Sequence, residues 1–147
     1  MSEHRVPPLS ITIPGKPIAQ GRPRGFSPKG SPAIRFYDPQ AKEKKQVSMM
    51  MAREVPDRGI DEPVRLCMKF VMPIVSGMKK AIVDTIRNGG WIPHVKKSDI
   101  DNMVKFYMDC ISMAGIWRDD SIVCSLRADK FYGDKPRTEV KIERQTT

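Results

Sequence analysis

One region of the chain carries acidic side chains in a spacing that favours metal binding. Asp99 and Asp101 are separated by a single residue, Lys105 follows them, and a second acidic pair, Asp119-Asp120, comes later. This region holds five of the 17 acidic residues of a chain whose formal net charge is +9. Carboxylate oxygens suit hard cations such as Mg²⁺, which assist the cleavage of phosphodiesters. These residues therefore indicate a nuclease.

The spacing of Asp99 and Asp101 favours a junction between extended chain and a helix. Within one regular helix, residues i and i+2 point about 200° apart, whereas in extended chain they share a face. Residues 93–98 are not typical of a helix, and an apolar period of 3.6 begins just after them. The free N–H groups of a helix start offset part of the repulsion between carboxylates. Lys105, four residues after Asp101, is predicted on the same side of that helix, where it can steady the carboxylate or hold a phosphate.

Asp120 is the third candidate ligand. It follows Gly115-Ile116-Trp117, where the chain is expected to leave the helix and begin a strand. We expect this turn to return Asp120 beside Asp99 and Asp101, so that three carboxylates and Lys105 surround one cation or two. Each part has a structural alternative, because an Asp in the first turn of a helix is often a cap and an Asp–Lys pair at i, i+4 is often a surface ion pair. The full combination in a basic chain favours the metal site.

The elements that must position these residues are predicted from apolar periodicity. Strands are predicted over 9–14, 64–72, 122–131 and 137–143, and helices over 40–54, 76–88 and 99–113. The second strand is expected to bury Val64, Leu66, Met68, Phe70 and Met72, and the last helix Ile100, Met103, Val104, Tyr107 and Ile111. The last two strands are predicted to pair as a hairpin through the turn-rich loop 133–136. The expected fold is a single α/β (α+β) domain, residues 1–147, in which helices cover a small mixed sheet.

Basic residues are concentrated in one segment. Residues 16–45 carry eight Lys or Arg against two acidic residues, a net +6. Most of this segment, residues 15–39, is predicted as a long surface loop because it is rich in Pro and Gly. A charge of this sign and size favours nucleic acid as the partner, although a solvated loop is the alternative. The candidate DNA-binding residues are Lys16, Arg22, Arg24, Lys29, Arg35, Lys96 and Lys97.

Composition narrows the class of protein further. No apolar run approaches the roughly 20 residues that span a bilayer, and the first residues lack the apolar core of a signal peptide. Three widely spaced cysteines, Cys67, Cys110 and Cys124, are typical of reduced, mostly buried thiols. We therefore expect a cytoplasmic protein with no membrane partner. His94 is interpreted as a plain loop histidine and Trp117 as a core anchor.

Three blocks of the sequence together resemble a known family. They are Ile13-Pro-Gly-Lys-Pro-Ile-Ala-Gln-Gly-Arg-Pro-Arg24, then Ser98-Asp-Ile-Asp-Asn-Met-Val-Lys105 with Gly115-Ile-Trp-Arg-Asp-Asp120, and Tyr132-Gly-Asp-Lys-Pro-Arg-Thr-Glu139. In this order they resemble the RusA-type Holliday junction resolvases, crossover junction endodeoxyribonucleases common in phages and prophages. Many relatives carry proline before the first aspartate, where this chain has Ser98.

The resemblance implies a homodimer that nicks four-way DNA junctions symmetrically in recombination and repair. It implies Mg²⁺ as cofactor, with Mn²⁺ as a substitute, and a bacterial or phage-infected cell as the setting. It also implies that Asp99, Asp101 and Asp120 are metal ligands and that Lys105 is essential. Two alternatives stay open: a different Mg²⁺-dependent nuclease, such as a flap nuclease, and a non-catalytic DNA-binding protein.

Overall fold

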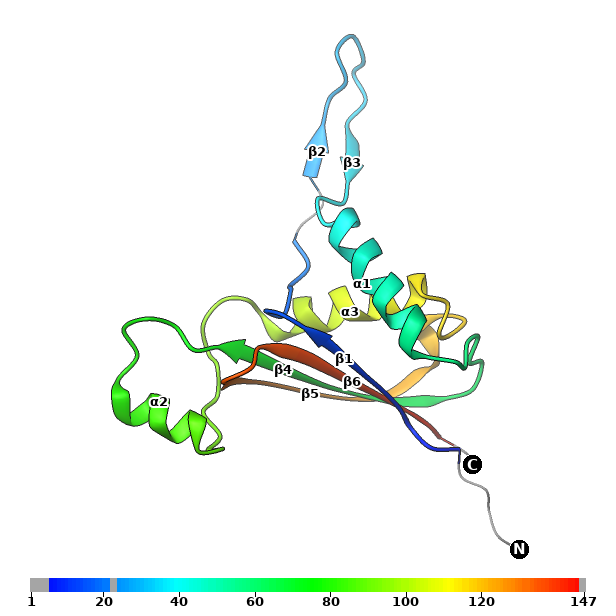
Figure 1. Ribbon diagram of the computed structural model, residues 1–147. Coiled ribbons are helices and arrows are strands. Elements are labelled where there is room, and N and C mark those ends of the chain that lie inside the picture. The colour runs from blue at the N-terminus through cyan, green and yellow to red at the C-terminus, as the bar shows by residue number, and fades with distance from the viewer. Residues whose placement is uncertain (1–5, 22–23, 146–147) are drawn as a thin grey trace, which may run out of the picture.

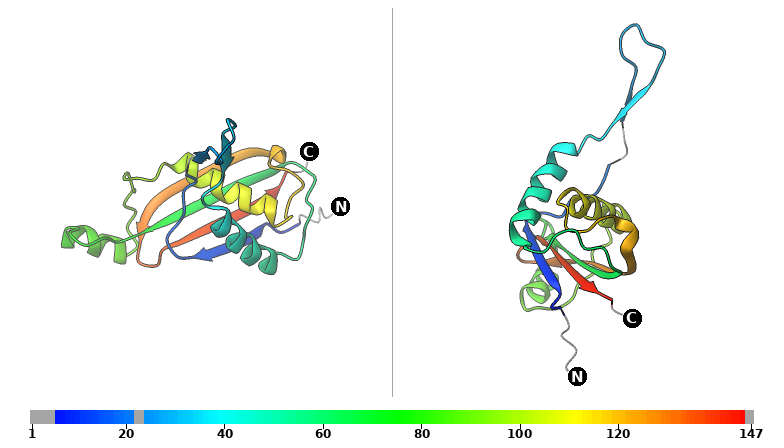
Figure 2. Two further views of the ribbon diagram at one scale, coloured as in Figure 1. Left: turned by 90° about the horizontal axis from the view of Figure 1, so that it is seen from above. Right: turned by 90° about the vertical axis from the view of Figure 1, so that its right-hand side faces the viewer.

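A four-stranded mixed sheet with two helices across one face forms the body of the protein. The computed structural model describes residues 6–21 and 24–145. The sheet has the order β1-β6-β4-β5, and α1 and α3 lie over it (Figure 1; Figure 2). The bounds are β1 (Leu9–Pro14), α1 (Ala41–Glu54), β4 (Val64–Pro73), α2 (Lys80–Arg87), α3 (Ile100–Met113), β5 (Val123–Gly133) and β6 (Arg137–Arg144), with a 3₁₀ turn, η1 (Asp120–Ile122), before β5. The predicted mixed α+β class is confirmed.

The core lies between this sheet and the helices α1 and α3. The central strand β4 buries Val64, Leu66, Met68, Phe70 and Met72, as its alternation predicts. α3 buries Met103, Val104, Phe106, Tyr107, Cys110 and Ile111. Ile100 was also predicted in this stripe, but it is 36% exposed because it opens the helix beyond the edge of the packed face. α2 begins at Lys80, later than predicted, and lies beyond the end of the sheet (Figure 1).

The connection of β5 to β6 differs from the predicted hairpin. β5 pairs parallel with β4, and β6 pairs antiparallel with both β4 and β1, so β4 separates the two consecutive strands. The short link after Gly133 must therefore cross the end of β4. A Cβ atom on Gly133 would overlap the side chain of Val71, which explains glycine at this crossing. The hairpin prediction was wrong because a turn-rich link shows that the chain reverses direction, but not that the two strands it joins are neighbours in the sheet.

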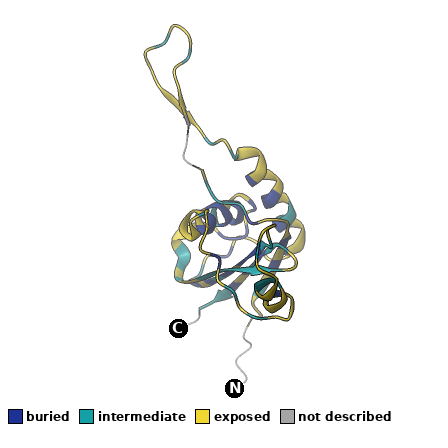
Figure 3. Cartoon of the chain, turned by 90° about the vertical axis from the view of Figure 1, so that its left-hand side faces the viewer, coloured by how far each residue is buried: buried dark blue, intermediate teal, exposed yellow. Residues whose placement is uncertain are grey.

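A thin hairpin stands away from the body (Figure 1). We call residues 24–37, which contain β2 (Arg24–Phe26) and β3 (Arg35–Tyr37), the β2–β3 arm. Its strands pair antiparallel with Gly25 opposite Phe36. The prediction of a loop without strands was wrong here, because strands of three residues are too short to show a period. Much of the arm is exposed, including Phe36 at 71% (Figure 3).

The cysteines are free, but only Cys110 is buried, whereas Cys67 is half-buried and Cys124 is exposed. The prediction of mostly buried thiols therefore holds for one residue of three. Within the described residues, no helix is long and apolar enough to cross a membrane.

Candidate active site

The start of α3 has the geometry that the sequence predicts. Asp99 is extended, with φ −70° and ψ 139°, and the helix begins at the next residue. The carboxylate of Asp99 makes no capping hydrogen bond, and both Asp99 and Asp101 are exposed. Among the described residues, neither Asp101 nor Lys105 forms a salt bridge. The two ordinary structural roles, helix cap and surface ion pair, therefore do not account for these side chains.

β5 holds the segment that leads into Asp99. The ammonium group of Lys130 donates hydrogen bonds to the backbone carbonyls of Lys96 and Ser98, at 2.9 and 2.6 Å. The same segment pairs with the edge of β5, where the N–H of His94 donates to the Lys130 carbonyl at 3.1 Å. Three contacts on one residue thus fix the backbone just before the candidate ligands. Sequence reasoning missed Lys130, because a lysine inside a predicted strand carries no local signal for this role.

The segment after β1 reaches the same end of α3. The N–H of Gln20 donates to the Asn102 carbonyl at 3.0 Å, and the N–H of Ile18 donates to the Tyr107 hydroxyl at 3.0 Å. The side chain of Gln40 holds this segment from the other side, since its amide donates to the Ala19 carbonyl and its oxygen accepts from the N–H of Gly21, both at 2.6 Å. Residues 18–21, which come before the β2–β3 arm in the sequence, are therefore held against the first turns of α3.

Asp119 and Asp120 have different surroundings. Asp119 caps η1, and its carboxylate accepts from the N–H of Ser121 at 3.2 Å. Hydrogen bonding from Ser121 holds the pKa of Asp119 below its usual value. Asp120 opens η1 and is exposed. Asp119 is thus engaged in the turn, whereas Asp120 stays a candidate ligand.

Asp120 does not return beside the other two aspartates within one chain. α3 has 14 residues, which at 1.5 Å each separate its two ends by about 20 Å. Asp99 and Asp101 lie at its start, whereas Trp117 lies past its end, paired with Ile60. Among the described residues, no group of three His, Cys, Asp or Glu side chains is close enough to hold a metal ion. Asp120 does not reach Asp99 and Asp101 because α3 carries the chain away from them, and η1 and β5 begin beyond the far end of this helix.

Comparison with known proteins places these features in a family. Residues 14–143 match the family described as Endodeoxyribonuclease RusA. The chain belongs to the RusA family. It is also 34% identical over 139 residues to the uncharacterized protein YqaN of Bacillus subtilis (strain 168), across 91% of this chain and 94% of that protein. Membership in the RusA family implies endodeoxyribonuclease activity.

The structure describes the side chains of five candidate DNA-binding residues of this RusA family member. Lys16, Lys29, Arg35, Lys96 and Lys97 are all exposed. Arg22 lies outside the described residues, and the structure describes the backbone of Arg24 but not its side chain. Lys29 and Arg35 belong to the β2–β3 arm, and Lys96 and Lys97 lie directly before the aspartates. Lys16 follows β1, in the segment whose Gln20 N–H donates to the Asn102 carbonyl in the first turn of α3.

One lysine of the basic segment has a structural task. Lys44 is 5% exposed, and its ammonium contacts Asp38 at 2.6 Å and Asp109 at 3.0 Å. Burial by itself lowers the pKa of Lys44, but the hydrogen bonds to the two carboxylates outweigh it and raise the pKa. Asp38 directly follows the β2–β3 arm, and Asp109 lies on α3. This buried bridge therefore fixes the second end of the arm to the same helix.

Trp117 and His94, which the sequence analysis also considered, are both buried in the body of the protein. Trp117 is 2% exposed and its indole N–H donates to the Ser112 hydroxyl at 2.7 Å, as expected for a core anchor. His94 was interpreted as a plain loop histidine, but it is buried against Tyr132 with 4.9 Å between the ring centroids. Burial, with Lys130 nearby, lowers the pKa of His94 and favours the neutral imidazole.

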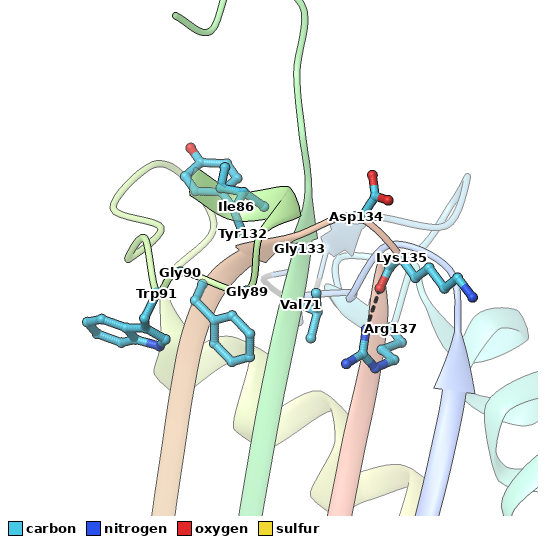
Figure 4. A pocket seen from close by; sticks show the side chains of 11 residues that line it. Val71, Ile86, Gly89, Gly90, Trp91, Tyr132, Gly133, Asp134, Lys135 and Arg137 are labelled. Atoms are coloured by element: carbon cyan, nitrogen blue, oxygen red, sulfur yellow. Dashed lines mark hydrogen bonds between the residues drawn. The ribbon is translucent and has the colours of Figure 1, made fainter. Parts of the chain in front are cut away.

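A separate hollow lies at the other side of the sheet end, beside α2 (Figure 4). Trp91, Ile86, Tyr132 and Arg137 are among the residues that line it, and no candidate catalytic residue of the described chain does. It therefore belongs to a different surface from the start of α3.

Proposed function

We propose that the protein is a Mg²⁺-dependent endonuclease that resolves Holliday junctions by paired symmetrical nicks, as a homodimer, in DNA recombination and repair. Its setting is the cytoplasm of a bacterium or of a phage-infected cell. One observation carries the proposal. Two exposed aspartates without a structural role lie at the start of a helix that packs one face on the core, in a basic chain of the RusA endodeoxyribonuclease family.

The residues at the start of α3 fit a hard cation by their chemistry. Asp99 and Asp101 offer carboxylate oxygens, the ligands preferred by Mg²⁺, with Mn²⁺ as a substitute. If these carboxylates held a divalent cation, it would supply a water of lowered pKa and positive charge to offset that of the phosphate. Within one chain the third candidate, Asp120, is at the far end of α3, so a single copy supplies two of the three proposed ligands.

The chain's own residues then have distinct tasks. Lys105, one turn after Asp101 on the same helix, adds positive charge beside the scissile phosphate. Lys130 is a positioning residue, because its ammonium holds the backbone on which Asp99 is mounted. Lys96 and Lys97 attract the DNA backbone to this end of the helix.

The β2–β3 arm supports DNA as the partner. It contains Lys29 and Arg35, and residues 24–37 include no acidic residue. It also exposes Phe26 at 47%, Phe36 at 71% and Tyr37 at 46%. A two-stranded ribbon is too thin to bury apolar groups on both faces, so these rings remain available to a partner. Basic groups bind phosphates and aromatic rings stack on unpaired bases, which together suit a branched rather than a fully paired DNA.

The test compares DNA shapes. We expect cleavage of a four-way junction with Mg²⁺ and much slower cleavage of a linear duplex of the same sequence. Equal rates on both would refute resolution of junctions and leave a general or flap nuclease. Tight junction binding without any metal-dependent product would instead leave a non-catalytic DNA-binding protein. Asp101→Asn is expected to abolish cleavage while junction binding in metal-free buffer persists, and retained cleavage would refute the ligand assignment.

A further inference from the structure

The hollow beside α2 lies at the same end of the sheet as the start of α3 (Figure 4). Its volume is about 330 Å³. The segment 91–98 links the two places, because Trp91 lines the hollow and the carbonyl of Ser98 accepts from Lys130 just before Asp99. Even a fully extended chain from Trp91 to Asp99 spans only about 26 Å. The hollow is therefore within reach of a DNA strand bound at the candidate active site.

Two aromatic rings line the hollow on the face of the sheet that no helix covers. The residues of β4 that alternate with Val71 face the helices, so Val71 and its in-register neighbour Phe131 face the other side. Pro93 pairs with Phe131, and Trp91 lies two residues before Pro93 in extended chain, which places its side chain on the same face. Trp91 is 62% exposed. Among the described residues, neither Trp91 nor Phe131 stacks on another ring.

Glycines leave part of the wall without side chains. Gly89, Gly90 and Gly133 all line the hollow. A Cβ atom on Gly90 would overlap Thr85, so the turn after α2 packs closely at this point. Bare backbone lets a flat ring approach closely, as a side chain on these residues would not.

The charge that the hollow offers to a ligand is positive. Lys135 is exposed and, within the described part of the chain, forms no salt bridge. Arg137 donates from Nε to Glu139 at 3.2 Å and from Nη1 to the Lys135 carbonyl at 2.8 Å, which leaves its Nη2 group free to donate. Asp134 also lines the hollow, but Arg87 pairs with it at 3.5 Å.

We propose that this hollow binds one unpaired nucleotide of the DNA, with the base stacked on Trp91 and Phe131 and its phosphate held by Lys135 and Arg137. The inference deepens the proposed function, on which the choice of DNA as ligand rests. The volume lies near the lower end of the roughly 300–1,000 Å³ of ligand sites and suits one base rather than a base pair. A base reaches such rings only when it is unpaired, so the site favours DNA that opens at a branch point over a continuous duplex.

A basic route joins the hollow to the start of α3. The N–H of Gly15 donates to the Pro136 carbonyl at 3.1 Å, which places Lys16 beside the link that carries Lys135. Lys96, on the segment between the hollow and Asp99, is exposed as well. At about 3.4 Å for each stacked nucleotide, roughly eight nucleotides cover the span from Trp91 to Asp99. One strand can therefore occupy the hollow and the candidate active site together.

Tryptophan fluorescence tests the stacking directly. The chain has two tryptophans, and Trp117 is 2% exposed, so quenching by a bound base reports on Trp91. An oligothymidylate of about 12 nucleotides in metal-free buffer is expected to quench this fluorescence as it binds, with binding followed by the anisotropy of a labelled strand. Trp91→Phe is expected to bind the strand without the quenching. Wild-type fluorescence that stays unchanged when the strand is fully bound would overturn the proposal.

Affinity measures the contribution of the ring. Trp91→Ala is expected to weaken binding of the oligothymidylate about 5- to 150-fold, since a base loses its stacking partner. Because Trp91 is largely exposed, the variant is expected to keep the melting temperature of the wild type. Val75→Ala is the matched control, because Val75 is 53% exposed and does not line the hollow, and its binding is expected to match wild type. Wild-type affinity of Trp91→Ala would refute the site.

Salt dependence measures the phosphate contact. Lys135→Gln is expected to reduce the slope of log K against log salt by about 0.7, the value for one phosphate of a single strand. Lys42→Gln, on the exposed side of α1, is expected to leave the slope unchanged. Equal slopes for wild type and Lys135→Gln would contradict the phosphate contact.

Photo-cross-linking extends the test to a branched DNA. Four-way junctions that carry bromodeoxyuridine at single positions are irradiated with the protein in metal-free buffer, and the linked peptide is identified by mass spectrometry. Trp91 is expected to cross-link to positions near the branch point, and cross-links from the interior of the paired arms alone would overturn the binding of an unpaired nucleotide. Cross-linking of Trp91 by a protein that cleaves no DNA would refute the proposed function and support this site. Junction cleavage with no cross-link at Trp91 would refute this site and leave the proposed function in place.

Discussion

The buried bridge of Lys44 gives the sharpest test of how the β2–β3 arm is held. Lys44→Met keeps the apolar stem of the side chain but removes the ammonium that Asp38 and Asp109 share. Loss of one partner of a fully buried ion pair costs about 3–5 kcal/mol. Here the lysine side chain is 7% exposed but the carboxylates are 33% and 36% exposed, so water can solvate them again. We therefore expect a loss of about 2 kcal/mol in the free energy of unfolding.

The assay is urea denaturation followed by circular dichroism, with thermal unfolding in parallel. For a chain of this size, a loss of about 2 kcal/mol corresponds to a fall of roughly 4–8 °C in the melting temperature. Lys42→Met on the exposed side of the same helix is the control and is expected to change stability by less than about 0.5 kcal/mol. A Lys44→Met protein as stable as this control would show that the bridge does not hold the arm to α3.

Acidic pH should reduce the effect of Lys44→Met. The hydrogen bond from Lys44 lowers the pKa of Asp38, so the folded protein favours the charged carboxylate. This contribution is complete above the ordinary pKa of an aspartate and is lost as the pH falls through the lower folded value. The raised pKa of Lys44 removes its contribution only in strongly alkaline solution. The stability difference between wild type and Lys44→Met is thus expected to be constant from pH 5 to 8 and to shrink below about pH 4.

Three further predictions concern single residues. Gly133→Ala should cost about 1–3 kcal/mol because its methyl group overlaps Val71, and adding Val71→Ala should cost less than the sum of the two single changes; additive losses in urea denaturation would contradict the overlap. Burial raises the pKa of the Cys110 thiol to about 12, so iodoacetamide at pH 8 should leave Cys110 unlabelled by mass spectrometry until the protein is unfolded; rapid labelling of the native protein would disprove this protection. Gln40→Ala removes the two hydrogen bonds to Ala19 and Gly21 and should lower the free energy of unfolding by about 1 kcal/mol. It should also slow junction cleavage by more than this loss of stability explains. An unchanged cleavage rate would show that these two hydrogen bonds have no functional role.

The apolar pattern of the sequence was sufficient to predict the elements in which that pattern repeats over many residues. The alternation of β4 and the apolar stripe of α3 each extend over ten or more residues, and both elements lie where they were predicted. The short strands of the β2–β3 arm have too few residues to show a period. Lys130 and Lys44 escaped notice for a related reason, because nothing beside them in the sequence marks the groups that they contact.

The sequence by itself determined the local geometry of the start of α3. Asp99 in extended chain, Asp101 in the first turn and Lys105 one turn later follow from local spacing, because backbone geometry over a few residues is fixed by φ and ψ preferences. The tertiary structure alone decided where Asp120 lies and that β4 separates β5 from β6. Such relations depend on which strands pair across long stretches of chain, and pairing is selected by the burial of the whole core rather than by any local spacing.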